Sequence, residues 1–357
     1  MIEKMTNLNA ITKVLYRVEN STSLGMFLRD TGGCLCSRLA LSRSKDESRE
    51  VFFVESSESA VFYFAVTPLT KLCSKISSKA LNVNPHKLSK PLVNTGKAMN
   101  KAAINLKLAK TFKIGATFSI LLPLIYGIVP MRNLITLSKS GKDEFITVIE
   151  LKQKQKSIRK AEARKKEKNL ISTLAKISLA GLALTTGAVT LAKRPAIFNK
   201  IEPAINKIIK HFDFKGDSGL TTKQLGFLIM PVSVASYFAA SRDKYETWEN
   251  IRRFTITLPM MFFGQNIVEK SVYKFFDKIH GSSLATAKGI TSYDEILKMP
   301  ASKRAKSLKS KNCSIATAFF INTMAIAAAV AALNVISTKN KFKKETKADF
   351  SQLDTNT

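Results

Sequence analysis

The residue types that most often carry catalysis are few in this chain and stand far apart. The three histidines, His86, His211 and His280, lie in separate lysine-containing connectors, as solvated surface histidines do. The sequence contains neither a His-Glu-x-x-His nor a Gly-x-Ser-x-Gly pattern. Gly96-Lys97 lacks the upstream glycine and the following Ser or Thr of a phosphate loop. We therefore expect a protein that is not an enzyme.

Residues that bind metals are no better placed. Cys34 and Cys36 form a Cys-x-Cys pair, but no histidine or second cysteine pair lies near them, which disfavours zinc. The acidic, glycine-bearing segment 213–219 resembles a calcium loop only in composition, because Lys215 occupies a ligand position. We expect reduced cysteines, no metal and no cofactor.

The elements that would have to position such groups are dominated by long apolar runs. A helix rises about 1.5 Å per residue, so roughly 20 apolar residues cross a hydrocarbon core of about 30 Å. Three runs come close to this length, a fourth is borderline because its ends are polar, and one is short. The sequence predicts an all-α polytopic membrane protein with four or five spans, drawn from the runs 114–131, 170–192, 224–241, 254–268 and 312–338. The alternative is a soluble helical bundle with buried core helices.

Composition divides the chain into three parts. Residues 1–96 are expected to form an N-terminal soluble or membrane-surface region, residues 97–340 a helical membrane domain, and residues 341–357 a polar tail. No secretory signal peptide is visible, so we expect the N-terminus to be cytoplasmic. Basic residues divide almost evenly between the two sides of a five-span topology, so they do not fix its orientation.

Two short runs near the N-terminus are typical of strands. Val51–Val54 and Ala60–Val66 are rich in β-branched and aromatic residues and flank the polar segment Glu55–Glu58, which favours a short β-hairpin. In the alternative interpretation, Ala60–Leu69 lies at the membrane interface and is interrupted by Pro68.

Three prolines inside apolar runs are candidate helix breaks. Pro123, Pro231 and Pro259 each remove a backbone hydrogen bond, as in transporters whose interrupted helices meet at mid-membrane. Without a companion charge, ordinary kinked packing is the favoured interpretation. A weak similarity between the segments around Pro123 and Pro259 is explained by chance at least as well as by an internal repeat.

Polar residues in or near the predicted spans are scarce. Lys176 is the one charged residue inside a span, where its side chain can reach the interface. Asn266 and Asn322 are expected to hydrogen-bond between helices rather than to bind a ligand. This set is too small for an ion pathway.

Aromatic and basic residues gather between the two central runs. Tyr245, Trp248, Arg252 and Arg253 follow the end of an apolar run, which is typical of a membrane-interface belt. Packing of a short connecting helix on the protein surface predicts the same positions.

The charge of the chain is strongly positive. A formal net charge of +31 points to anionic partners, namely phospholipid headgroups or nucleic acid. Two basic segments directly precede apolar runs, which favours contact with anionic lipid and makes nucleic acid the weaker choice. The candidate lipid contacts are Lys165, Lys166, Lys168, Lys303 and Arg304.

The sequence thus favours a non-enzymatic structural or scaffold protein in a membrane, whose basic segments hold anionic lipid or an acidic protein partner. A second copy of the chain is a further candidate partner. The alternatives are a small transporter or channel built on proline-broken helices and, with least support, a soluble nucleic-acid-binding helical protein.

Overall fold

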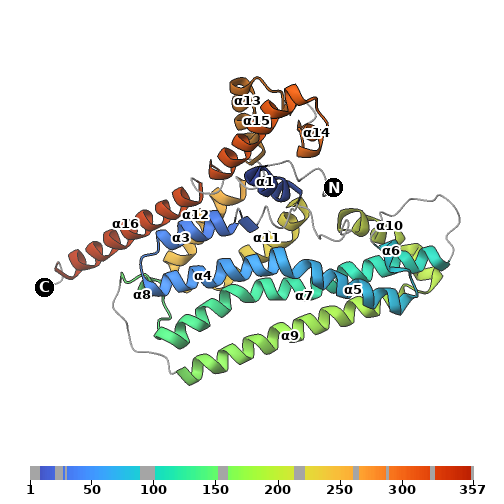
Figure 1. Ribbon diagram of the computed structural model, residues 1–357. Helices are drawn as coiled ribbons and strands as arrows, with labels where there is room; N and C mark the ends of the chain where they lie inside the picture. The colour runs from blue at the N-terminus through green and yellow to red at the C-terminus, as the bar shows by residue number, and fades with distance from the viewer. Residues whose placement is uncertain are drawn as a thin grey trace. The chain divides into compact units, whose positions relative to one another are not determined.

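The structure, a computed structural model, is helical over 87% of the residues that it describes, so the all-α class is confirmed (Figure 1). One two-stranded antiparallel ribbon pairs Ala285 with Ile290. The structure describes residues 9–20, 27–28, 30–88, 101–151, 160–212, 222–259, 265–286, 289–321 and 326–354.

The chain forms two compact units, each made from segments distant in sequence. Unit 1 comprises Met1–Glu55, Glu144–Lys154 and Arg242–Thr357, and unit 2 comprises Ser56–Asp143 and Gln155–Ser241. The units are defined by contacts, whereas the division at residues 96 and 340 was drawn from composition and stays a prediction.

Unit 2 is built around one long helix, α7, which packs against α5, α9, α10 and α11. Leu108, Leu121 and Ile125 of α7 are buried, so this helix supplies the core of the unit. The elements of unit 2 are the π-helical turn η2 (Ala60–Ala65), α5 (Val66–Leu81), α6 (Pro85–Leu88), α7 (Lys101–Ser140), α9 (Lys160–Leu191), α10 (Pro195–Phe212) and α11 (Thr222–Ala239).

Unit 1 contains two main helix pairs, α13 with α15 and α12 with α16. Helices α1 and α14 also pack on α15, and α3 packs on α16. Its elements are α1 (Ala10–Asn20), the π-helix η1 (Asp30–Leu35), α3 (Cys36–Ala40), α4 (Lys45–Ser59, whose last turn belongs to unit 2), α8 (Phe145–Val148), α12 (Lys244–Pro259), α13 (Gln265–His280), β1 (Ala285–Thr286), β2 (Gly289–Ile290), α14 (Tyr293–Leu297), α15 (Ala301–Phe319) and α16 (Ile326–Asp354).

The predicted β-hairpin in the N-terminal region is wrong. Helix α4, the π-helical turn η2 and α5 follow one another without a break from Lys45 to Leu81. Val51 and Val54 are buried while Phe52 is exposed, a spacing of three that belongs to a helix rather than to a strand. Packing in the folded chain has overridden local β-propensity, which is a weak preference.

Two of the three candidate helix breaks lie inside continuous helices. Helix α7 continues through Pro123, and α11 continues through Pro231. Pro259 is the last described residue of α12.

Two helices of the described chain are long and apolar enough to cross a membrane. They are α7 and residues Glu162–Leu191 of α9, and Met230–Ala239 is a shorter apolar stretch. The described residues of run 254–268 belong to α12 and α13, and those of run 312–338 to α15 and α16, while residues 260–264 and 322–325 lie outside the described part. Among the described residues two candidate spans are found, and the prediction of four or five spans stays a prediction.

Candidate functional site

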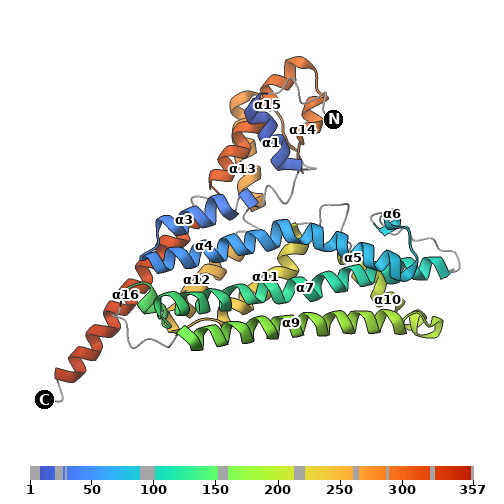
Figure 2. The same ribbon diagram turned by 60° about the horizontal axis from the view of Figure 1, so that its bottom comes forward.

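The most unusual surface of unit 2 is the apolar side of α9. This helix lies along α7, its main neighbour (Figure 2). In the most apolar stretch of 18 residues in each helix, half of the stretch is buried in α7 but only 6% of it in α9. Leu184 of α9 is 75% exposed, and Ile171, Ile177, Leu179 and Leu191 are also exposed. Helix α9 thus presents a bare apolar surface along most of its length.

The side of α9 that does pack against α7 is lined by small residues. A Cβ added to Gly181 would lie 2.8 Å from Ser119 Oγ, and one added to Gly115 would lie 2.7 Å from Thr185 Cγ2. Leu174 stands in the same way against Gly127. Each helix therefore contributes a small-x-x-x-small pair, Gly115 with Ser119 and Gly181 with Thr185, which lets two backbones approach closely.

The two hydroxyl groups at this contact are already satisfied. Ser119 Oγ donates to the Gly115 carbonyl and Thr185 Oγ1 to the Gly181 carbonyl, both at 2.8 Å and within their own helices. No polar atom of these side chains needs a partner across the contact, which suits an apolar surrounding.

The register of the pair is antiparallel, because Gly115 faces Thr185 and Gly127 faces Leu174. The uncharged run 114–131 of α7 therefore lies beside roughly residues 170–186 of α9. Basic residues bound this stretch: Lys113 and Arg132 on α7, Lys168 on α9, and Lys193 two residues after the end of α9. Within it, Lys176 of α9 is exposed, as expected for a lysine that reaches out of an apolar stretch.

The basic residues assigned to lipid have different surroundings. Lys165, Lys166 and Lys168 are exposed in the first turns of α9, where Lys166 Nζ lies 3.3 Å from Glu162. Lys303 is exposed on α15, whereas Arg304 donates to the Met299 carbonyl at 2.9 Å.

The two asparagines are not both described by the structure. Asn266 is the second residue of α13, and Asn322 lies outside the described residues. Their predicted role in hydrogen bonding between helices stays a prediction.

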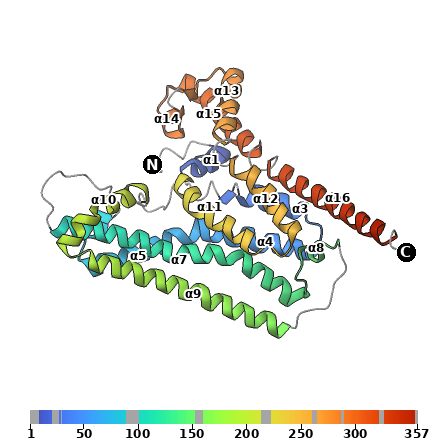
Figure 3. The ribbon, with the colours of Figure 1, turned by 180° about the vertical axis from the view of Figure 1, so that it is seen from behind.

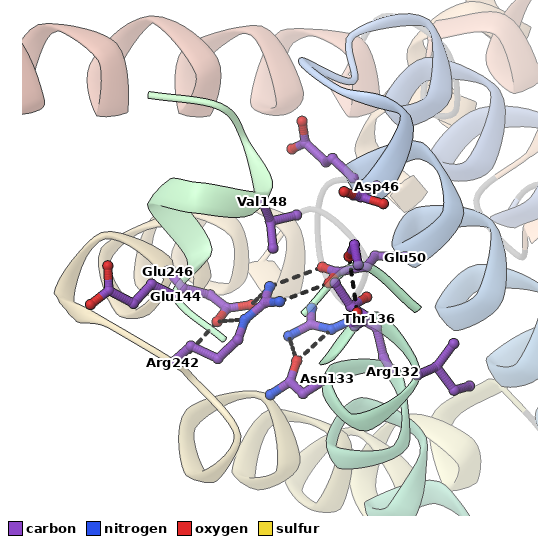
Figure 4. Close-up of polar contacts among 12 residues, drawn as sticks. Asp46, Glu50, Arg132, Asn133, Thr136, Glu144, Val148, Arg242 and Glu246 are labelled. Carbon is purple, nitrogen blue, oxygen red and sulfur yellow. Dashed lines mark hydrogen bonds and ion pairs between the residues drawn. The ribbon is translucent and has the colours of Figure 1, made fainter. Parts of the chain in front are cut away.

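Unit 1 contains a network of buried ion pairs that the sequence did not reveal. Its centre is Arg242, directly before α12, which binds both carboxylate oxygens of Glu50 at 2.7 and 2.9 Å and Glu246 at 3.0 Å (Figure 4). The three side chains are only 3–6% exposed. Burial opposes the charged guanidinium, but the charges of Glu246 and Glu50 outweigh it and raise the pKa of Arg242.

Two further arginine–carboxylate groups surround this centre. Arg43 bridges Glu47 at 2.5 Å and Glu249 at 2.8 Å. Glu55 of α4 accepts from Arg253 of α12 at 3.0 Å and also from Arg38 of α3. Although burial favours its neutral form, Arg38 and Arg253 hold the pKa of Glu55 below its usual range. The network thereby connects α3, α4 and α12.

An aromatic ring lies close to two of these arginines. The guanidinium carbons of Arg43 and Arg242 lie 5.2 and 5.7 Å from the centre of the Phe145 ring of α8. Ser44 Oγ donates to the Val148 carbonyl, and Asp243 accepts from the Ile146 backbone, so two hydrogen bonds attach α8 to its neighbours. The short α8 thus places the Phe145 ring next to Arg43 and Arg242.

Residues assigned to an interface belt all lie on α12 but have separate partners. Tyr245 is buried and donates to Glu345. Trp248 is half exposed, and Lys341 Nζ lies 4.8 Å from the centre of its ring. Arg252 donates to Asn334 and Thr338 of α16. With Arg253 bound to Glu55, both arginines take part in the contacts of unit 1, and their position at a membrane interface stays a prediction.

A second unforeseen cluster surrounds Lys311 of α15. Its ammonium group lies 2.6 Å from Glu19 of α1, donates to the Thr291 carbonyl at 2.7 Å, and sits 5.2 and 5.3 Å from the ring centres of Tyr273 and Tyr293. Burial, and then the charge of Glu19, raise the pKa of Tyr293. The cluster attaches α1 to α15.

These clusters explain the stability of unit 1 better than they explain any reaction. The carboxylates of the network are bound to arginines, and the described residues contain no group of three or more His, Cys, Asp and Glu that could hold a metal. No protein-family model matches this chain, and neither a curated protein nor a solved structure matches it.

Proposed function

We propose that the chain is a non-enzymatic structural protein of a membrane, anchored by a hairpin of α7 and α9. The observation that carries this proposal is the bare apolar surface of α9. Only 6% of the most apolar stretch of 18 residues in this helix is buried. A core helix of a soluble protein buries its apolar side against its neighbours, whereas lipid covers such a surface without cost.

The dimensions of the hairpin support the proposal. The uncharged run Ile114–Met131 has 18 residues, which corresponds to about 27 Å of helix against a hydrocarbon core of about 30 Å. The small residues at the α7–α9 contact supply close van der Waals packing, on which helix association in lipid depends because the hydrophobic effect no longer drives it.

The basic residues at the ends of the hairpin fit the same proposal. Lys165, Lys166 and Lys168 precede the apolar part of α9, where anionic headgroups attract lysine by about 1 kcal/mol per residue near the surface. Unit 1, with its buried ion pairs, then serves as the folded module that this anchor holds at the membrane.

Extraction of cell membranes tests the proposal. Carbonate at high pH and high salt should leave the tagged full-length protein in the membrane, and detergent should release it. Release by carbonate or by salt alone would contradict an integral anchor and would indicate a charged surface contact instead.

A second arrangement, in which α9 lies along the membrane surface without crossing it, is favoured by one observation. Lys71, Lys75 and Lys79 are exposed on α5, which packs beside α7, so charged groups stand next to the proposed anchor. Single cysteines replacing Lys165 and Lys193 in a cysteine-free chain separate the two arrangements. A membrane-impermeant thiol reagent should label them from opposite sides if α9 crosses, and from the same side if it does not.

A further inference from the structure

Unit 1 has a helix whose outward face carries both charge and large apolar groups. On α13, Lys270, Lys274 and Lys278 recur every four residues and are all exposed. Phe275 and Ile279 follow the second and third of these lysines directly and are 61% and 56% exposed. Residues four apart lie on one side of a helix, so the lysines form a row with apolar side chains along its edge. The opposite side of α13 packs on α15 (Figure 3).

The acidic residues of α13 do not balance this row. They are Glu269, which is half-buried, and Asp277, which is buried and accepts from the backbone of Leu284 and Ala285 at 2.7 and 2.8 Å. None of the three lysines forms an ion pair with a described residue. The face therefore has a net positive charge as well as an uncovered apolar edge.

We infer that this face of α13 docks unit 1 on an anionic phospholipid surface. Lysines beside large apolar side chains on one face of a helix match the two layers of a membrane interface, since the ammonium groups meet headgroup phosphates while the apolar side chains enter the acyl boundary. The inference adds to the proposed function a second membrane contact, in unit 1, and it does not require α9 to cross the bilayer.

The docking is specific to α13 rather than to exposed phenylalanine in general. Phe52 of α4, also in unit 1, is 58% exposed, nearly as much as Phe275, but no lysine row flanks it. Lys303, Lys306 and Lys309 are three exposed lysines of α15, on which no large apolar side chain is exposed between Ala301 and Phe319. These two sets are the matched controls for ring and for charge, and the second also tests the lipid contact expected from the sequence at Lys303, because the inference assigns the contact in unit 1 to α13 instead.

Quenching of a single tryptophan by brominated phospholipid tests the inference on the full chain in nanodiscs. Trp248 is the only tryptophan, so W248F removes the background and F275W or F52W places the probe. In discs containing phosphatidylserine, the emission of the F275W variant should be quenched and blue-shifted, whereas that of the F52W variant should not. K270E/K274E/K278E should abolish most of the quenching in the F275W variant, and K303E/K306E/K309E should leave most of it.

Three results would overturn the inference. They are equal quenching in the F275W and F52W variants, equal loss with the two lysine triples, and a shift of the F275W emission by an RNA homopolymer where anionic discs produce none. A probe at Leu184 of α9, L184W in the same background, reports on the proposed anchor separately. If the L184W probe is quenched but the F275W probe is not, only the proposed α13 contact is ruled out. If the F275W probe is quenched but the L184W probe is not, only the proposed anchor is ruled out.

Discussion

At the scale of single residues, Arg242 is the most buried arginine of the ion-pair network, with a side chain that is 6% exposed. R242M removes the guanidinium group that Glu50 and Glu246 bind, and breaking a buried pair in this way costs about 3–5 kcal/mol. We expect a large fall in the thermal unfolding midpoint of the detergent-solubilised protein. R49M is the control, because Arg49 is 52% exposed in its pair with Asp46, where such a pair contributes about 1 kcal/mol or less. Equal effects of the two changes would contradict the account.

Glu55 makes the stability of unit 1 depend on pH. Its pKa is lower in the folded chain than in the unfolded chain, so its contribution is complete above the unfolded value and is lost as the pH falls through the folded value. Unfolding midpoints measured from neutral to acidic pH should therefore decline for the wild type below about pH 5. The unfolding midpoint of E55Q should be lower at neutral pH, because Arg38 and Arg253 lose the carboxylate that they bind. It should also decline less as the pH falls. A parallel decline in both proteins would show that Glu55 is not responsible.

The ion-pair network also shows what the sequence could not predict at this scale. Its members come from residues 38–55 and 242–253, nearly 200 positions apart, and nothing in local composition pairs Arg242 with Glu50. Arg252 and Arg253 were identified as notable, but from their position after an apolar run, which carries no information about partners on α16 and α4. The lysine of the α1–α15 cluster, Lys311, ends a basic segment for which the sequence predicted contact with lipid.

At the scale of elements, the contact between α7 and α9 allows a direct test. G181L should force the two helices apart, because its side chain would meet Ser119, and overpacking of this kind costs about 1–3 kcal/mol. G187L is the control on the same helix, since a Cβ at Gly187 meets nothing within 4 Å. Disulfide formation between cysteines at positions 115 and 185 should fall in G181L and persist in G187L. A similar fall in both variants would contradict this packing.

The helical class and the two apolar helices could be predicted from sequence because both depend on composition over long windows. The β-hairpin was wrong because Val51–Val54 and Ala60–Val66 satisfy strand propensity locally, whereas contacts made elsewhere in the fold hold them in a helix. Whether the uncharged runs 254–268 and 312–338 are spans stays a prediction, because residues 260–264 and 322–325 lie outside the described part of the chain. The small residues facing each other across α7 and α9 became visible only in the register of the pair.

At the scale of the whole molecule, the central claim is that α9 meets lipid with its bare apolar side. The most direct measurement is quenching of the single indole in the W248F/L184W chain by brominated phosphatidylcholine in neutral nanodiscs, where lysine contacts contribute little. We expect strong quenching and a blue-shifted emission that salt does not change. Emission typical of a water-exposed indole, with no quenching at any salt concentration, would contradict the membrane anchor.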